Sequence, residues 1–200
     1  MIKAVLFDIG NVFVHWSPRF LYEKLIPDSD KLDHFLKNIV TLEWHTEHDR
    51  GRPFKEGVRI LTEQYPEYAD LVTAFDDRWD ETINGEVEGM AALAYQLADM
   101  GVPLYALTNF SQEKWPAFAH DYAFTKLFKG VVVSGEEGMV KPDPQIYQIV
   151  LVRYGLRPEE ILFIDDRDEN IFAAEKLGMH GHIFKSATLL EGALEEHGLL

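Results

Sequence analysis

The sequence of 200 residues contains no cysteine. Disulfide bonds, thiolate metal sites and a cysteine nucleophile are therefore excluded, and the absence is typical of a cytoplasmic protein. No apolar run approaches the roughly 18 residues that a bilayer-spanning helix needs. The chain passes from Met1-Ile2-Lys3 directly into an apolar strand, without the charged, apolar and cleavage regions of a signal peptide. We therefore expect a cytoplasmic protein without a membrane segment.

Basic residues are scarce. The chain has 19 Lys and Arg against 34 Asp and Glu, a formal net charge of −15. A surface of this sign argues against nucleic acid or an anionic membrane as the partner. A small phosphorylated metabolite would need local help from a bound cation, a few placed basic side chains or helix N-termini.

The stretch Ala4-Val5-Leu6-Phe7-Asp8-Ile9-Gly10-Asn11-Val12 is the most informative part of the sequence. Its apolar run has no alternation, which predicts a central strand buried on both faces of a parallel sheet. Such sheets bind ligands at the carboxyl ends of their strands. Asp8 is therefore a candidate site residue, and Gly10 marks the expected turn.

The rest of the chain divides into two kinds of pattern. Apolar spacings of three and four predict packed amphipathic helices, with no convincing strand, up to about residue 84. Beyond residue 86, strands at 104–107, 131–133, 161–164 and 182–184 alternate with helices at about 90–97, 144–154 and 168–177, as in α/β proteins. We predict a doubly wound parallel sheet (residues 1–15 and 85–200) with an inserted small α-helical cap domain (16–84).

The predicted strand ends supply the groups that phosphoryl transfer needs. Asp8 follows the first strand, Thr108-Asn109 a second and Asp165-Asp166 a third, with Lys141 between the last two. A carboxylate can accept a phosphoryl group, and paired carboxylates suit Mg²⁺. Hydroxyl, amide and ammonium groups can hold the phosphate oxygens.

The motifs that carry these groups are Phe7-Asp8-Ile9-Gly10-Asn11-Val12, Leu107-Thr108-Asn109, Val140-Lys141-Pro142 and Ile164-Asp165-Asp166. In their order and spacing they resemble the four motifs of the haloacid dehalogenase-like (HAD) hydrolase superfamily, whose core is a Rossmann-like α/β sheet. The resemblance runs from the first strand to about residue 184. The helical segment falls where this superfamily places its small helical cap.

The resemblance implies a role for each residue. Asp8 would be the nucleophile and a Mg²⁺ ligand, and Gly10 would lend its backbone carbonyl to the metal. Asp165 and Asp166 would complete the metal site, with Asn170 nearby. The residues implied to hold the phosphoryl group are Thr108, Asn109 and Lys141.

Position 10 departs from the superfamily pattern. Most of its phosphatases carry a second Asp there, which protonates the leaving oxygen and then activates water, whereas this chain has Gly10. General acid–base assistance is worth about 10²–10⁴ in rate. A phosphatase subgroup acting on sugar phosphates such as glucose 1-phosphate has a similar Asp-x-Gly-Asn-Val motif. His15, His45 and His48 are candidate proton donors by residue type.

Two alternatives follow from the same departure. The 2-haloacid dehalogenases, which are metal-independent, also lack the second Asp, but the Asp165-Asp166 pair would repel their carboxylate substrates. The second alternative is a catalytically weak phosphate-binding protein. Our interpretation is a Mg²⁺-dependent phosphomonoester hydrolase, acting through an aspartyl-phosphate on a small metabolite, plausibly a sugar phosphate.

The cap is expected to contact the rest of the substrate, because the strand-end site binds only the phosphoryl group. The polar, aromatic stretch 44–52 is the candidate contact loop, with His45, His48 and Arg50 as candidate specificity residues. The pattern is compatible with a monomer or a homodimer.

Overall fold

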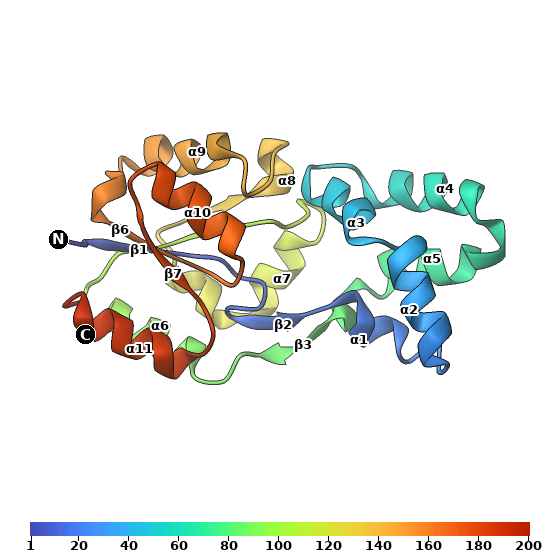
Figure 1. Ribbon diagram of the computed structural model, residues 1–200, viewed down its shortest axis with the longest axis horizontal. Helices are drawn as coiled ribbons and strands as arrows, with labels where there is room; N and C mark the ends of the chain where they lie inside the picture. Colours follow the sequence, from blue (N-terminus) through green and yellow to red (C-terminus); the bar gives the residue numbers. More distant parts are fainter.

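The computed structural model describes residues 1–200 and has two parts, an α/β core and a helical cap (Figure 1). Both chain termini lie at the end of the core that is farthest from the cap. None of the helices has the length and apolar character needed to cross a bilayer.

The core is built on a five-stranded parallel sheet with the order β5-β4-β1-β6-β7. Its strands are β1 (Ala4–Phe7), β4 (Leu104–Thr108), β5 (Gly130–Val133), β6 (Ile161–Asp165) and β7 (His180–Ile183). Val5 and Phe7 of β1 belong to one apolar cluster and Leu6 to another, and all three are fully buried. The central strand is therefore covered on both faces, as its unbroken apolar run predicts.

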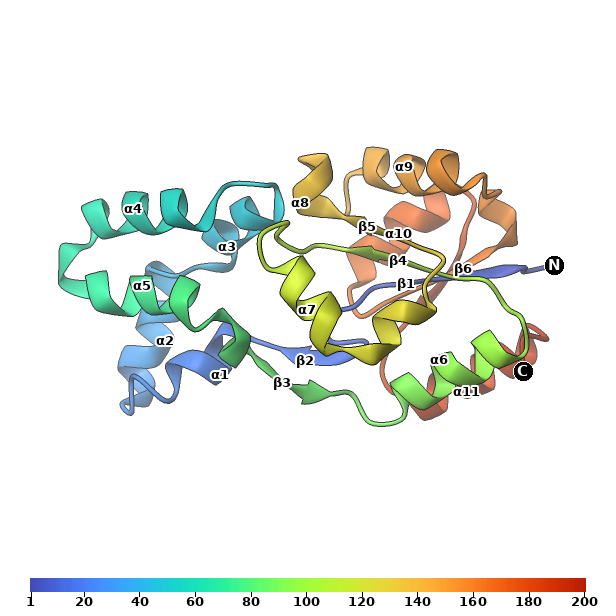
Figure 2. The same cartoon turned by 180° about the vertical axis from the view of Figure 1, so that it is seen from behind.

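Helices cover both faces of the sheet. Figure 2 shows α9 and α10 on one side and α6 and α11 on the other. The core helices are α6 (Met90–Asp99), α7 (Trp115–Asp121), α8 (Ser134–Glu137), α9 (Pro144–Tyr154), α10 (Asp168–Lys176) and α11 (Ala187–Glu196), with the 3₁₀ helices η3 (Ala123–Leu127) and η4 (Pro158–Glu160). The doubly wound fold with a helical insertion is confirmed.

The insertion packs as a small helical bundle beyond the carboxyl ends of the strands (Figure 1). Its elements are α1 (Pro18–Tyr22), α2 (Ser29–Asn38), α3 (Leu42–Asp49), α4 (Phe54–Gln64), η1 (Pro66–Tyr68), α5 (Ala69–Asp77) and η2 (Trp79–Thr82). Ser17 caps α1 by accepting a hydrogen bond from the Arg19 N–H (3.2 Å), and Pro18 occupies the first turn, where its missing N–H costs nothing.

A two-stranded antiparallel ribbon joins the two parts and was not predicted. It pairs β2 (Val14–Trp16) with β3 (Ile83–Glu86), with Val14 opposite Glu86 and Trp16 opposite Ile83. Most of β3 is exposed and Gly85 has a positive φ of 77°, so the sequence carries no apolar alternation there. The expectation of helices alone up to residue 84 is therefore wrong at β3.

A second correction concerns residues 44–52. Most of this stretch is the helix α3, which Thr41 caps by accepting a hydrogen bond from the Trp44 N–H (3.1 Å). Trp44 and His45 are buried within it. The predicted contact loop is thus mainly a helix, and its aromatic side chains are buried rather than exposed on a loop.

Candidate active site

A cavity of about 560 Å³ lies between the carboxyl ends of the strands and the cap. The core contributes Asp8, Gly10, Asn11, Asn109, Phe110, Lys141, Asp166, Arg167 and Asn170. The ribbon and η2 contribute Val14, Trp16, Trp79 and Ile83, and α3 contributes Leu42, Glu43, His45, Thr46 and Asp49. The cavity is therefore polar on the core side and mixed on the cap side.

Lys141 joins two of the strand-end carboxylates. Its Nζ lies 2.8 Å from Asp8 Oδ1 and donates a 2.7 Å hydrogen bond to Asp165 Oδ2. All three side chains are buried. A bond from the Ile9 N–H to Asp8 Oδ1 (2.7 Å) also orients the Asp8 carboxylate, and no hydrogen bond engages its second oxygen.

Asp165 organises this network from a fully buried position. Both of its oxygens accept hydrogen bonds from Asn170 Nδ2, at 2.9 and 3.0 Å, and Oδ1 also accepts the Arg167 N–H at 2.9 Å. Asp165 does not line the cavity, whereas Asp8 and Asp166 do. Asp8 and Asp166 therefore present the carboxylate oxygens that face the cavity.

The donor set fits a divalent cation. Carboxylate oxygens of Asp8, Asp165 and Asp166 lie within 4.8 Å of one another. Together with Lys141 they carry a formal charge of −2, which one Mg²⁺ would balance, and carboxylate oxygens are the ligands that Mg²⁺ prefers. Asp8 and Asp166, which line the cavity, could hold it.

The charges in this cluster shift each other's titration. Burial raises the pKa of Asp8 to about 7, with Lys141 opposing the shift and Asp165 adding to it. Burial and Asp165 likewise raise the pKa of Asp166. For Lys141 burial disfavours the charge, yet Asp165 and Asp8 raise its pKa overall. The shared Lys141 ammonium therefore stays charged, but it does not fully compensate the burial of Asp8.

The remaining phosphate candidates lie on β4 and beside it. Asn109 accepts a hydrogen bond from the Lys141 N–H at 2.8 Å and donates one to the Lys141 carbonyl at 3.1 Å. Its side chain thereby fixes the backbone that carries the lysine. Thr108 is buried at the end of β4 and does not line the cavity, while Asn109 does.

Gly10 lines the cavity, but the backbone does not need a glycine there. Its φ is not positive, and a Cβ at this position would meet no atom within 4 Å. Asn11 is instead the residue in the left-handed region, with a φ of 56°. The missing side chain at position 10 therefore leaves open space rather than relieving a clash.

The cap candidates occupy different places. His45 is buried on the cavity wall, where it stacks on Trp16 with ring centroids 4.7 Å apart. His48 is buried away from the cavity and stacks on Phe54 (4.3 Å). His15 and Arg50 are exposed and do not line the cavity. Of the predicted cap and proton-donor residues, the structure brings only His45 to the site.

Asp49 is the site residue that sequence reasoning missed. Its carboxylate is buried in the cavity wall, 3.3 Å from His45 Nε2. The spacing of four residues between His45 and Asp49 places both on one face of a helix. That spacing is visible in the sequence, but it becomes informative only once residues 44–49 are known to be helical.

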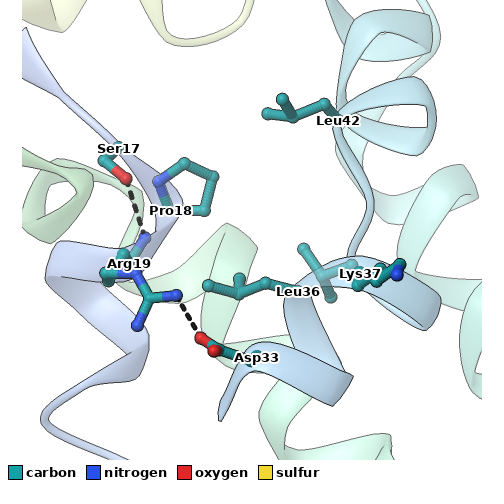
Figure 3. Close-up of a pocket in the computed structure, with 8 residues that line it drawn as sticks. Ser17, Pro18, Arg19, Asp33, Leu36, Lys37 and Leu42 are labelled. Atoms are coloured by element: carbon teal, nitrogen blue, oxygen red, sulfur yellow. Dashed lines mark hydrogen bonds and ion pairs between the residues drawn. The ribbon is translucent and has the colours of Figure 1, made fainter. Parts of the chain in front are cut away.

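A second hollow of about 450 Å³ lies within the cap, among α1, α2 and the start of α3 (Figure 3). The ion pair between Arg19 and Asp33 lies at its edge, and Leu42 borders both this hollow and the main cavity. It contains none of the strand-end groups, so we place the chemistry in the cavity at the sheet.

Phosphatases are among the proteins whose sequences are similar to this chain. The chain is 29% identical over 192 residues to a sesquiterpene phosphatase of Aspergillus oryzae, with 94% of each chain covered. It is 27% identical to a glyceraldehyde 3-phosphate phosphatase of Methanopyrus kandleri, covering 90% of this chain and 82% of that protein. Two other relatives are longer proteins, of which the chain spans 17% and 38%.

Solved structures show the same fold. A HAD family enzyme of Bacteroides thetaiotaomicron, in complex with magnesium and inorganic phosphate, superposes with a TM-score of 0.73 at 21% identity and covers 93% of this chain and 96% of that one. The family model described as haloacid dehalogenase-like hydrolase matches residues 2–178. The chain therefore belongs to the haloacid dehalogenase-like hydrolases.

Proposed function

We propose that the protein is a Mg²⁺-dependent phosphomonoester hydrolase that works through an aspartyl-phosphate on Asp8. The observation that carries the proposal is the placement of Asp8, which lies at the cavity floor with one oxygen fixed by Lys141 and the other free of hydrogen bonds. An oriented carboxylate with a free oxygen can attack phosphorus in line with the bond that breaks.

The neighbouring groups supply what such an attack needs. Bound Mg²⁺ would neutralise the phosphoryl oxygens and draw them toward Asp8. Lys141 holds the Asp8 carboxylate in place, and Asn109 keeps the lysine backbone at the cavity. The phosphatases among the relatives support the same reaction class.

The cavity bounds the substrate. Its volume of about 560 Å³ suits a small metabolite. Trp16, Trp79 and Phe110 form apolar walls, which can pack against the C–H face of a sugar or against an apolar alcohol. A sugar phosphate therefore remains our predicted substrate, with a phosphorylated apolar alcohol as the other member of the class.

A screen of phosphomonoesters tests the proposal. We expect phosphate release with added Mg²⁺, loss of activity with a chelator, and no turnover by Asp8→Asn. Glu191→Gln, an exposed substitution on α11 with the same change of charge, is the matched control and should retain wild-type activity. Chloride release from 2-chloropropionate without metal would contradict the proposal in favour of a dehalogenase. Phosphate binding without turnover would favour a binding protein.

A further inference from the structure

An alkyl phosphate needs a proton donor in this cavity. Its alkoxide leaves slowly unless the oxygen is protonated as the bond to phosphorus breaks. In an in-line displacement that oxygen lies opposite the attacking carboxylate. Since Asp8 attacks from the core side, the donor must stand on the cap side.

The groups on the core side are poorly suited. Lys141 is held by Asp8 and Asp165, and the open space at Gly10 holds no side chain. On the cap side, burial lowers the pKa of His45 to about 3, with His48 and Arg52 adding to the shift, so the imidazole is neutral near pH 7.

Asp49 is the cap carboxyl that meets the requirement. It lies in the cavity wall on α3 with 6% of its surface exposed. No Lys or Arg forms an ion pair with it, and the nearest titratable side chain is His45, whose Nε2 lies 3.3 Å from Oδ2. A carboxyl without a cation beside it, and with a neutral imidazole as neighbour, is suited to carry a proton.

The electrostatics agree with this placement. Burial raises the pKa of Asp49 well above its ordinary value, and the Asp8 charge raises it further, while Lys141 opposes the shift. Asp49 lines the same cavity as Asp8 and Lys141, so their charges act on its carboxyl. The Asp49 carboxyl thus keeps its proton at a pH where an exposed Asp would have lost it.

The end of α3 is fixed to the core, which holds Asp49 over the site. Ser134 Oγ donates a 2.6 Å hydrogen bond to the Asp49 carbonyl and accepts one from the Phe110 N–H at 2.9 Å. Gly51 has a positive φ of 98°, and a Cβ there would lie 2.8 Å from the Gly135 carbonyl oxygen. Only a glycine lets the two parts approach so closely, and this approach positions the carboxyl.

We propose that Asp49 is the general acid and base of the reaction, an inference that rests on the proposed phosphatase function. As Asp8 attacks phosphorus and the bond to the alcohol oxygen breaks, the Asp49 carboxyl gives its proton to that oxygen and becomes a carboxylate. The carboxylate then takes a proton from water, whose oxygen attacks the aspartyl-phosphate. Asp8 leaves as a carboxylate, phosphate is released and Asp49 is again protonated.

His45 acts in this scheme as a positioning residue. Its ring stacks on Trp16, which places Nε2 3.3 Å from Asp49 Oδ2 and limits the movement of the Asp49 carboxyl. Its Nδ1 is buried and has no hydrogen-bond partner. Because the His45 ring is neutral, it adds no positive charge beside the Asp49 carboxyl.

Asp49→Asn tests the inference with two aryl phosphates and Mg²⁺. The leaving group of p-nitrophenyl phosphate departs readily without a proton, whereas that of phenyl phosphate does not. We expect kcat/KM to fall about 10²–10⁴-fold for phenyl phosphate but less than about tenfold for p-nitrophenyl phosphate. Since the two esters are of similar size, a merely structural defect would lower both values equally, and that result would overturn the inference.

A burst measurement examines the second half of the cycle. Asp49→Asn should release about one equivalent of p-nitrophenolate quickly and then turn over slowly, because water lacks its base. Glu47→Gln, an exposed carboxyl on the same helix, is the matched control and should keep the wild-type ratio for the two substrates.

Wild-type kinetics keep the inference testable even if the variant fails to fold. The wild type should hydrolyse both esters with kcat/KM values within about tenfold, because an acid removes most of the leaving-group dependence. A wild type that strongly prefers p-nitrophenyl phosphate would overturn the role of Asp49 alone. A wild type inactive on all phosphomonoesters would overturn the proposed function as well.

Discussion

Asp8→Asn should stabilise the metal-free protein while it abolishes turnover. Burial raises the pKa of Asp8 from 3.8 to about 7, against the opposing effect of Lys141. At about 1.4 kcal/mol per pH unit, ionised Asp8 lowers the free energy of unfolding by up to about 4 kcal/mol above pH 7. Asn is close to the same size, carries no charge and can still accept the Ile9 N–H.

The stability that Asp8→Asn gains over the wild type should increase with pH. The folded wild type keeps the Asp8 proton up to about pH 7, whereas the unfolded chain releases it near pH 3.8. Wild-type stability therefore falls as the pH rises between these values, and the variant does not share that fall. We expect the variant to be more stable by about 1–4 kcal/mol at pH 8 and by much less near pH 4.

Urea denaturation in the presence of a chelator, followed by circular dichroism, measures this difference. Glu191→Gln removes one exposed charge from α11 and should change the free energy of unfolding by less than about 0.5 kcal/mol. Added Mg²⁺ should stabilise the wild type more than Asp8→Asn, because ligands bind the folded site. A variant no more stable than the wild type at pH 8 would refute the reasoning.

Two further substitutions probe other parts of the molecule. Lys141→Met should destabilise the metal-free protein by about 3–5 kcal/mol and abolish phosphate release, since it leaves Asp8 and Asp165 without their shared cation. Urea denaturation measures the stability, and a variant as stable as the wild type would contradict this prediction. Gly57→Ala should cost about 1–3 kcal/mol, because its Cβ would lie 2.2 Å from the buried His48 ring; an unchanged melting temperature would show that the ring can move aside.

The core could be predicted from the sequence because its signals are local. The apolar run around Leu6 predicts a buried strand, and parallel strands bring their carboxyl ends to one edge. Asp8, Asn109 and Asp166 therefore had to converge once the strands were recognised. Lys141 follows no strand end, but the structure still brings it between Asp8 and Asp165.

The remainder depends on contacts between distant segments. The strand β3 contains Asn84 and Gly85, which have little strand propensity, and it forms because it pairs with β2. Asp49 becomes a site residue because Ser134, 85 positions away, binds the end of its helix to the core. Neither the pairing of β2 with β3 nor the contact between Ser134 and Asp49 has a local sequence pattern. The sequence therefore does not predict that these residues lie close together.

The ribbon of β2 and β3 also bears on how the chain folds. The strands β1 and β4 are neighbours in the sheet, but the whole cap lies between them in the sequence. Such distant pairs form slowly because a long loop must close. Once Val14 pairs with Glu86, the cap no longer contributes to that loop. The chain between β1 and β4 then behaves like a short connection. The sheet can therefore assemble while the β2–β3 ribbon already joins the two ends of the cap.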